Sequence, residues 1–107
     1  MHALLVTYEN DIPAVEAKGH PDNIGFAEWL KTLPGLVMKT WINDGKTFGG
    51  FYIFTDKASA DAYVNGEMFQ GAVPKDPANR NVQITHFEVF TELSGMTGSP
   101  SKPLGGT

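Results

Sequence analysis

Cysteine is absent from this sequence of 107 residues. Its absence excludes disulfide bonds, thiolate nucleophiles, iron–sulfur clusters and zinc sites built on cysteine. Long apolar runs are absent as well, since no stretch approaches the roughly 18 residues that a membrane-spanning helix needs. The apolar run that follows Met1 has no basic leader and is too short for a secretory signal peptide. We therefore expect a cytoplasmic protein with no membrane partner.

Positive charge is scarce in the chain. Eight Lys+Arg stand against twelve Asp+Glu, the net charge is −4, and Arg80 is the only arginine. The basic residues are scattered singly, so they form no footprint for the phosphates of a nucleic acid. Glycine-rich nucleotide-binding loops and the Gly-x-Ser-x-Gly motif of serine hydrolases are missing too. We expect no nucleic-acid partner and none of these chemistries.

The sequence does contain enough apolar side chain for one core, because 41% of its residues are hydrophobic. A chain of this length is typical of one domain, which we place at residues 1–94. Residues 95–107 are rich in Gly, Ser, Thr and Pro and predict an extended C-terminal tail, with Met96 and Leu104 as its apolar anchors. We expect this tail to cross the interface of a dimer. Packing in a crystal lattice is the alternative account of an ordered tail.

The spacing of apolar residues divides the chain into six elements. The pattern predicts strands over residues 2–8, 36–43, 48–55 and 82–90, and helices over residues 21–33 and 56–65. We expect the carboxylate of Asp22 to cap the first helix and that of Asp56 to cap the second. Residues 9–21 and 71–81 are predicted to be loops, with a further turn near Phe69.

The element order β-α-β-β-α-β predicts an α+β fold of the ferredoxin-like kind, with a four-stranded antiparallel sheet and both helices on one face. Residues 2–8 and 48–55 are apolar on both faces, whereas a strand with one wet face alternates apolar and polar residues. Something must therefore cover the face away from the helices. A second copy of the chain, giving a homodimer, is the favoured cover.

A nucleic-acid platform is the alternative cover for this face. Residues 46–54 are similar to the third-strand signature of RNA-recognition motifs, in which aromatic side chains stack on bases. Three features oppose this interpretation: an extra glycine shifts the aromatic spacing, residues 2–8 have no central aromatic residue, and the net charge is negative. The dimer therefore remains the favoured interpretation.

Aromatic side chains are candidate walls or donors of a ligand pocket, namely Trp29, Trp41, Tyr52 and Tyr63. Aromatic residues at such spacings also build ordinary cores, so both interpretations stand. Lys39 shares a strand face with Trp41 and is interpreted first as protection of a sheet edge, with a pocket cation as the alternative. Gly49 and Gly50 indicate a bulge or room for a neighbour such as Trp41, with space for a ligand as the alternative.

His86 is the only histidine inside a predicted element, where it shares a strand face with Ile84 and Glu88. It has no second ligand at metal-binding spacing, so it predicts no metal site. Two interpretations remain open. His86 is either a partly buried histidine held by a hydrogen bond, or a general base in a pocket.

Between Pro34 and Tyr63 the sequence follows the pattern PG…K-x-W…GG-x-Y-x-FTD…SA-x-AY. This pattern resembles the YdhR-like putative mono-oxygenase family of the dimeric α+β barrel superfamily, and a weaker match extends to Ser94. The resemblance implies a ferredoxin-like protomer whose sheet packs against the sheet of its twin to form a barrel. Related barrel proteins oxidise aromatic polyketides without metal or flavin, degrade haem or isomerise lactones.

The resemblance implies a mono-oxygenase that needs no cofactor and acts on a small, flat, apolar or phenolic molecule in a pocket between the sheet and the helices. In such chemistry an electron-rich carbanion reacts with dioxygen, and the protein supplies a base, a dry cavity and donors for the developing oxyanion. His86 is the candidate base, and the four aromatic side chains are the candidate donors or walls. The alternative is a dimeric protein that binds a small molecule without chemistry, as a sensor or carrier.

Overall fold

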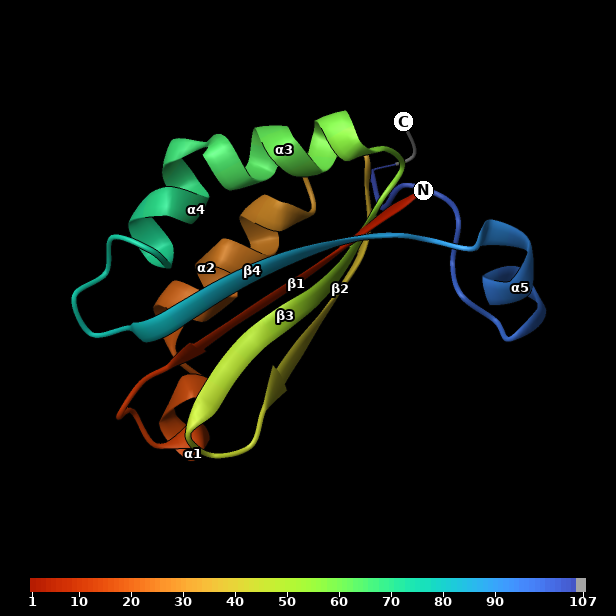
Figure 1. Cartoon of the computed structure of the whole chain (residues 1–107). Coiled ribbons are helices and arrows are strands. Elements are labelled where there is room, and N and C mark those ends of the chain that lie inside the picture. The colour runs from red at the N-terminus through yellow and green to blue at the C-terminus, as the bar shows by residue number, and fades with distance from the viewer. Residues whose placement is uncertain (106–107) are drawn as a thin grey trace.

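The computed structural model describes residues 1–105, which fold into a four-stranded antiparallel sheet with helices on one face (Figure 1). The elements in chain order are β1 (His2–Glu9), α1 (Ala14–Ala17), α2 (Pro21–Leu30), β2 (Leu36–Asn43), β3 (Thr47–Phe54), α3 (Lys57–Asn65), α4 (Glu67–Ala72), β4 (Arg80–Glu88) and α5 (Thr91–Met96). The strand order is β2-β3-β1-β4. The predicted α+β, ferredoxin-like fold is therefore confirmed for the single chain.

The core lies between the sheet and helices α2, α3 and α4. Alternation along β1 and β3 sends every second side chain to the helix side, where apolar residues of the helices meet them. The buried members of this core are Leu4, Val6, Leu30, Leu36, Tyr52, Phe54, Ala60, Tyr63, Phe69 and Val73. The same alternation leaves Leu5 and Phe51 on the opposite face of the sheet.

The helix ends show which of the predicted caps form. Asp56 caps α3 as predicted, since its carboxylate accepts a hydrogen bond from the backbone N–H of Ser59 at 2.7 Å. The predicted cap of α2 is wrong, because the ring Nδ1 of His20 accepts from the backbone N–H of Asp22 at 3.1 Å. Pro21 explains the shift: proline favours the first helical position, where its missing N–H costs no hydrogen bond, so the cap lies one residue before it.

Two short helices lie where a loop or a tail is expected. α1 interrupts the predicted loop 9–21 with one turn that begins after Pro13. α5 begins at Thr91 and runs past residue 94, where the predicted domain ends and the predicted tail begins. Helices of one or two turns are too short to show an apolar period, so the sequence pattern gives no sign of them.

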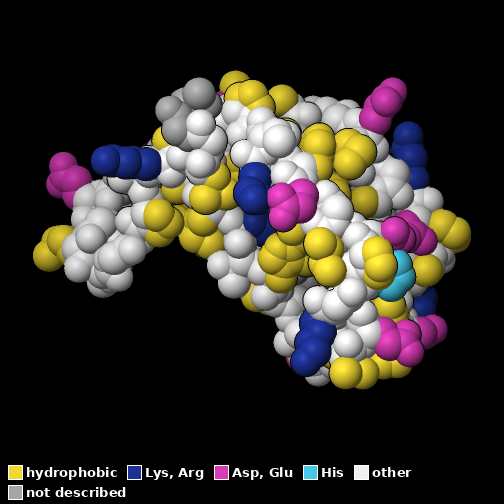
Figure 2. All heavy atoms as spheres, turned by 180° about the vertical axis from the view of Figure 1, so that it is seen from behind, with side chains coloured by type: hydrophobic (Ala, Val, Ile, Leu, Met, Phe, Trp, Pro, Cys, Tyr) yellow, Lys and Arg dark blue, Asp and Glu magenta, His cyan; other side chains and the backbone are white. Residues whose placement is uncertain are grey.

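Beyond α5 the chain turns back toward the sheet. The backbone N–H of Leu104 donates to the carbonyl of Leu36, at the start of β2, over 2.9 Å. The C-terminal segment forms a lobe that stands off one end of the body, and hydrophobic side chains gather where the lobe meets the body (Figure 2). The predicted tail anchors are exposed in the single chain, at 82% for Met96 and 56% for Leu104. Residues 106–107 of the predicted tail lie outside the described residues.

The face of the sheet away from the helices carries apolar side chains, as the two-faced strands predict. Leu5 and Phe51 are half-buried on this face. Phe87 of β4, which pairs with Ala3, is 47% exposed. The segment around α5 adds three more exposed apolar side chains, those of Phe90, Leu93 and Met96. The single chain therefore leaves an apolar surface without a partner in its described part.

Candidate functional site

A pocket of about 790 Å³ lies between the sheet and helices α2 and α4, in the place that the sequence predicts. Its volume falls within the range of small-molecule sites. Strands β1, β2 and β3 form one wall, and the helices and the loop after α4 form the other. The larger apolar side chains on these walls are those of Tyr8, Phe26, Trp41, Phe48, Tyr52 and Met68. The pocket is therefore lined by aromatic and polar side chains, with Lys39 in its sheet wall.

Lys39 lies among three aromatic rings. Its Nζ is 3.5 Å from the ring centroid of Trp41, 4.8 Å from that of Tyr52 and 5.2 Å from that of Phe26. Strand geometry explains two of these contacts, because Trp41 is two residues further along β2 and Tyr52 is the cross-strand partner of Lys39 on β3. Helix α2 supplies Phe26 from the opposite wall. Of the two interpretations of Lys39, the structure favours the pocket cation.

Gly50 creates the space that Lys39 occupies. A Cβ atom at this position would lie 2.6 Å from Cε of Lys39 and 3.1 Å from the ring of Tyr52. A Cβ at Gly49 would instead collide with the backbone carbonyl of Val6 on the neighbouring strand. The pairing of β1 with β3 is regular through both glycines, so they mark close approach and not a bulge.

The amine of Lys39 is shifted toward its neutral form. Burial in the pocket lowers its pKa from 10.5 to about 7, because the surroundings solvate the ammonium less well than water does. The faces of the three rings attract the ammonium and oppose this shift, but they do not replace the hydrogen bonds that water supplies. Within the described residues no carboxylate lies within ion-pair distance of Nζ. Lys39 therefore titrates near neutral pH.

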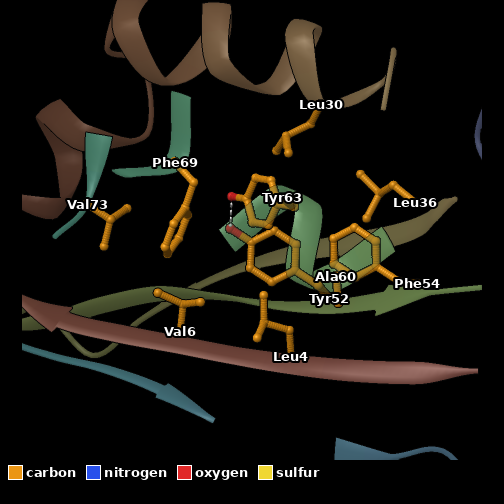
Figure 3. Packing of buried hydrophobic residues seen from close by; sticks show 10 residues of the cluster. All are labelled: Leu4, Val6, Leu30, Leu36, Tyr52, Phe54, Ala60, Tyr63, Phe69 and Val73. Carbon is orange, nitrogen blue, oxygen red and sulfur yellow. Dashed lines mark hydrogen bonds between the residues drawn. The ribbon is translucent and has the colours of Figure 1, made fainter. Parts of the chain in front are cut away.

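Tyr52 and Tyr63 share a hydrogen bond behind the pocket wall. Their hydroxyl oxygens are 2.7 Å apart, and the two rings, which come from β3 and α3, are tilted by 48° with their centroids 5.1 Å apart (Figure 3). Burial is the first cause that raises the pKa of each hydroxyl, and the neighbouring tyrosine further raises that of Tyr63. Both side chains therefore stay protonated at physiological pH. One hydroxyl donates and the other accepts, so this bond uses the proton of only one of them.

The aromatic residues predicted from the sequence fall into two groups. Trp41 and Tyr52 line the pocket. Trp29 stacks on Phe26 with 5.3 Å between ring centroids, and it lies 6.2 Å from Tyr63, which is part of the core. Trp29 and Tyr63 are not among the residues that line the pocket. They support its wall from behind, so the four residues belong to one aromatic cluster, joined through Phe26, of which two members line the pocket.

His86 lies away from this pocket. It pairs with Leu4 across β4 and β1, is exposed, and its Nδ1 is 2.8 Å from Nε2 of His2. The pocket walls come from β1, β2, β3 and the helices, whereas β4 is the opposite edge of the sheet. The expected position of His86 in the pocket is therefore not observed, and its role as a base stays a prediction that the geometry does not favour.

Two further features of the described residues bear on the kind of site. Residues 1–105 contain no cluster of three or more histidine, aspartate or glutamate side chains placed to hold a metal ion. In the same part of the chain, no helix has the length and apolar character needed to cross a membrane.

Solved structures of other proteins share this fold. The chain is similar to a putative antibiotic biosynthesis monooxygenase from Deinococcus radiodurans, with a TM-score of 0.64 and 14% identity over 83% of this chain and 92% of that one. It is similar to the NE2512 protein of unknown function from Nitrosomonas europaea, with a TM-score of 0.56 and 23% identity over 83% of this chain and 88% of that one. It is also similar to a mutant of MhuD with two manganese protoporphyrin IX molecules bound per active site. The TM-score is 0.54 and the sequence identity 13%, over 82% of this chain and 94% of that one. At these identities the likeness shows the fold alone.

The sequence also matches a known family. The family described as "Putative mono-oxygenase ydhR" matches residues 4–100, a range that takes in all the strands and helices except the first two residues of β1. This range includes the whole pocket wall, from Val6 to Asn79. A comparison with curated proteins gives no match. The chain therefore belongs to the family described as "Putative mono-oxygenase ydhR", as the pattern between Pro34 and Tyr63 indicates.

Proposed function

We propose that the pocket binds a small, flat, apolar or phenolic molecule and that the protein oxidises it with dioxygen as a cofactor-independent mono-oxygenase. The observation that carries this proposal is the pocket wall, in which an amine is set among three aromatic rings. Flat aromatic molecules pack well against such rings. Membership of the ydhR family supports the class of reaction. The MhuD mutant, which shares the fold and holds a flat porphyrin, supports the shape of the ligand.

The reaction that suits this site starts from an acidic C–H or O–H group beside an electron-rich ring. A base removes the proton, and the resulting anion reacts with dioxygen. For a ring methylene, one oxygen atom forms the new carbonyl and the other leaves as water, so the two C–H bonds of the substrate supply the four electrons. The protein contributes a proton acceptor, an apolar wall that excludes water and a fixed orientation of the ring.

Dioxygen uptake with 1,8-dihydroxyanthrone, an activated ring methylene, tests this function. We expect uptake above the rate in buffer, and a lower rate for Trp41→Ala, because the indole forms part of the pocket wall. Val15→Ala is the matched control, since Val15 is 71% exposed on α1 and does not line the pocket. Equal rates with protein and with buffer, while the anthrone binds, would refute the oxygenase.

A non-catalytic binding protein, acting as a sensor or carrier, is the second candidate. The observation that favours it is the engagement of the Tyr52 hydroxyl by Tyr63, which leaves fewer polar groups facing a ligand. Binding of anthrone without oxygen uptake would support this candidate. Absence of binding, measured by quenching of tryptophan fluorescence, would contradict both candidates.

We also propose that two chains associate as a homodimer through the sheet face away from the helices. Its support is the apolar surface on that face, where Phe87 is 47% exposed, together with exposed Leu93 and Phe90 near α5. A stable interface of this kind buries on the order of 2,000 Å² in total. Light scattering should give twice the chain mass of 11.6 kDa. Phe87→Glu should give the single-chain mass, whereas Val15→Glu, at an exposed site on α1, should not. A single-chain mass for the unchanged protein at micromolar concentration would refute the dimer.

A further inference from the structure

We propose that Nζ of Lys39 takes the proton of an acidic hydroxyl on a flat aromatic ligand and then holds the resulting phenolate as its counter-ion. This inference rests on the proposed function, because it needs an aromatic ligand in the same pocket. It adds the residue that handles the proton and the class of ligand, namely phenols and enols. His86, the base predicted from the sequence, has no part in it.

The first support is the position of Nζ. The side chain of Lys39 crosses the empty space above Gly50 and ends against the ring of Trp41, within the pocket wall. Phe26 and Tyr52 surround it at 5.2 and 4.8 Å. A ligand that packs on this wall meets Nζ as a polar group among apolar neighbours. The hydroxyl of that ligand is then the group that forms a hydrogen bond with Nζ.

The second support is that Lys39 has no anionic partner. Within residues 1–105, no carboxylate lies within 4.0 Å of Nζ, whereas Lys31, Lys46, Lys57 and Arg80 each have one at that distance. The titratable groups that line the same pocket are those of Tyr8, Tyr52, His20, Asp22, Glu67 and Asp76. A cation in an apolar wall without its own anion favours a ligand that brings one.

The tyrosine and histidine side chains on the walls are less suited to accept this proton. The hydroxyl of Tyr52 is engaged by Tyr63, and burial raises its pKa. Burial and the charge of Asp76 raise the pKa of Tyr8. His20 caps α2, since its Nδ1 accepts from a backbone N–H. Lys39 has a neutral fraction near neutral pH, because burial lowers its pKa to about 7.

The proton step is balanced without a further reactant. The ligand O–H bond breaks, an N–H bond forms on the neutral amine, and the oxygen keeps the electron pair. Nothing is oxidised or reduced in this step. The products are a phenolate and an ammonium side by side in an apolar wall, where their attraction exceeds that of the same pair in water.

The test uses 4-nitrophenol as the probe, because its phenolate is yellow and its phenol is not. Bound probe is titrated by absorbance in the unchanged protein, in Lys39→Met and in Lys31→Met. Lys31 is the matched control, since it is exposed and pairs with Glu28 on the surface. We expect the pKa of the bound probe to fall by about one unit, a tenfold shift in ionisation, in the unchanged protein and in Lys31→Met. In Lys39→Met it should equal or exceed the value in free solution.

The outcomes separate this inference from the proposed function. Probe that binds but ionises alike in the unchanged protein and in Lys39→Met would overturn the role of Lys39 and leave the pocket proposal standing. Absence of probe binding to the unchanged protein would overturn both. Should Lys39→Met fail to fold, 4-nitroanisole, which has no proton to give, replaces the variant. We expect the phenol to bind at least as tightly as the anisole at a pH at which it begins to ionise in solution, because Nζ holds the phenolate. Binding of the phenol that weakens relative to the anisole as the phenol ionises would overturn the inference.

Discussion

The hydroxyl groups of Tyr52 and Tyr63 form a closed pair inside the core, 2.7 Å apart and without another hydrogen-bond partner in the described residues. Tyr52 faces the pocket with its ring and the core with its hydroxyl. The pair therefore fixes the ring of Tyr52 against Lys39, because moving the ring would break a buried hydrogen bond.

Tyr63→Phe should lower the free energy of unfolding by about 1–3 kcal/mol, because it leaves the buried hydroxyl of Tyr52 unsatisfied. The double variant Tyr52→Phe with Tyr63→Phe should cost less than the sum of the two single variants, since no polar group is then left alone. Urea denaturation of the four proteins completes the cycle. Additive losses would show that the two hydroxyls act independently.

His2 should make the protein less stable at mildly acidic pH. Its side chain is buried, at 9% exposed, and its pKa is lowered first by burial and then by the charge of His86. Between the lowered value and the unfolded value of 6.5, the unfolded chain binds more protons than the folded one. The free energy of unfolding should therefore fall as pH drops through this window and level off below it.

The control for this pH dependence is His2→Gln, which removes the titrating ring. Thermal unfolding from about pH 7.5 to about pH 5 should show a flatter pH dependence for the variant than for the unchanged protein. The carboxylates of Asp44 and Asp56 do not contribute to the change in stability over this pH range. Their pKa values are lowered from 3.8, so their contributions are lost only at more acidic pH. An unchanged slope in His2→Gln would contradict the prediction.

Gly50→Ala should destabilise the protein by about 1 kcal/mol, because the new methyl group overlaps Cε of Lys39, and the flexible end of the lysine can move aside at modest cost. The cost should be smaller when Lys39 is replaced by Ala as well, since the overlapping atoms are then gone. Gly25→Ala in α2 is the contrasting control, because a Cβ there meets nothing within 4 Å and alanine favours a helix. Equal costs of Gly50→Ala in both backgrounds would contradict the shared-space argument.

Removal of the residues after Ser94 should weaken the proposed dimer. The truncation deletes the end of α5 and the contact between Leu104 and Leu36. If the C-terminal segment crosses the interface, the dissociation constant measured by analytical ultracentrifugation should rise on truncation. An unchanged constant, together with an unchanged midpoint of thermal unfolding, would show that the segment takes no part in the assembly.

The sequence pattern predicted the four strands and the two longer helices well, because the periodic spacing of apolar residues identifies such elements. Residues 36–43 were predicted as a strand, and β2 has those bounds. β4 begins at Arg80 instead of 82, because its first two residues are polar and Asn81 has a positive φ of 51°, so they add no apolar alternation to the strand. The short helices α1 and α5 carry no period, and only tertiary structure reveals them.

The candidate site could be predicted only in part. A strand face shared by Lys39 and Trp41 follows from their spacing, but the ring of Phe26 reaches them from α2, and no sequence spacing encodes that contact. His86 lies on the helix side of the sheet, as its register with Leu4 shows. Its distance from the pocket depends on strand order, since β4 is the edge opposite β2. Strand alternation gives the face of a residue and not the place of its strand in the sheet.

The central position of β1 has a consequence for how the chain folds. β1 pairs with β3 on one side and with β4 on the other, so both partners come much later in the sequence. Non-local pairing of this kind slows folding. Until β4 docks, the backbone N–H and C=O groups along the edge of β1 that β4 will cover are free to pair with another chain. We therefore expect the species most prone to aggregate during refolding to be the one that lacks β4, and we expect refolding yield to fall as protein concentration rises.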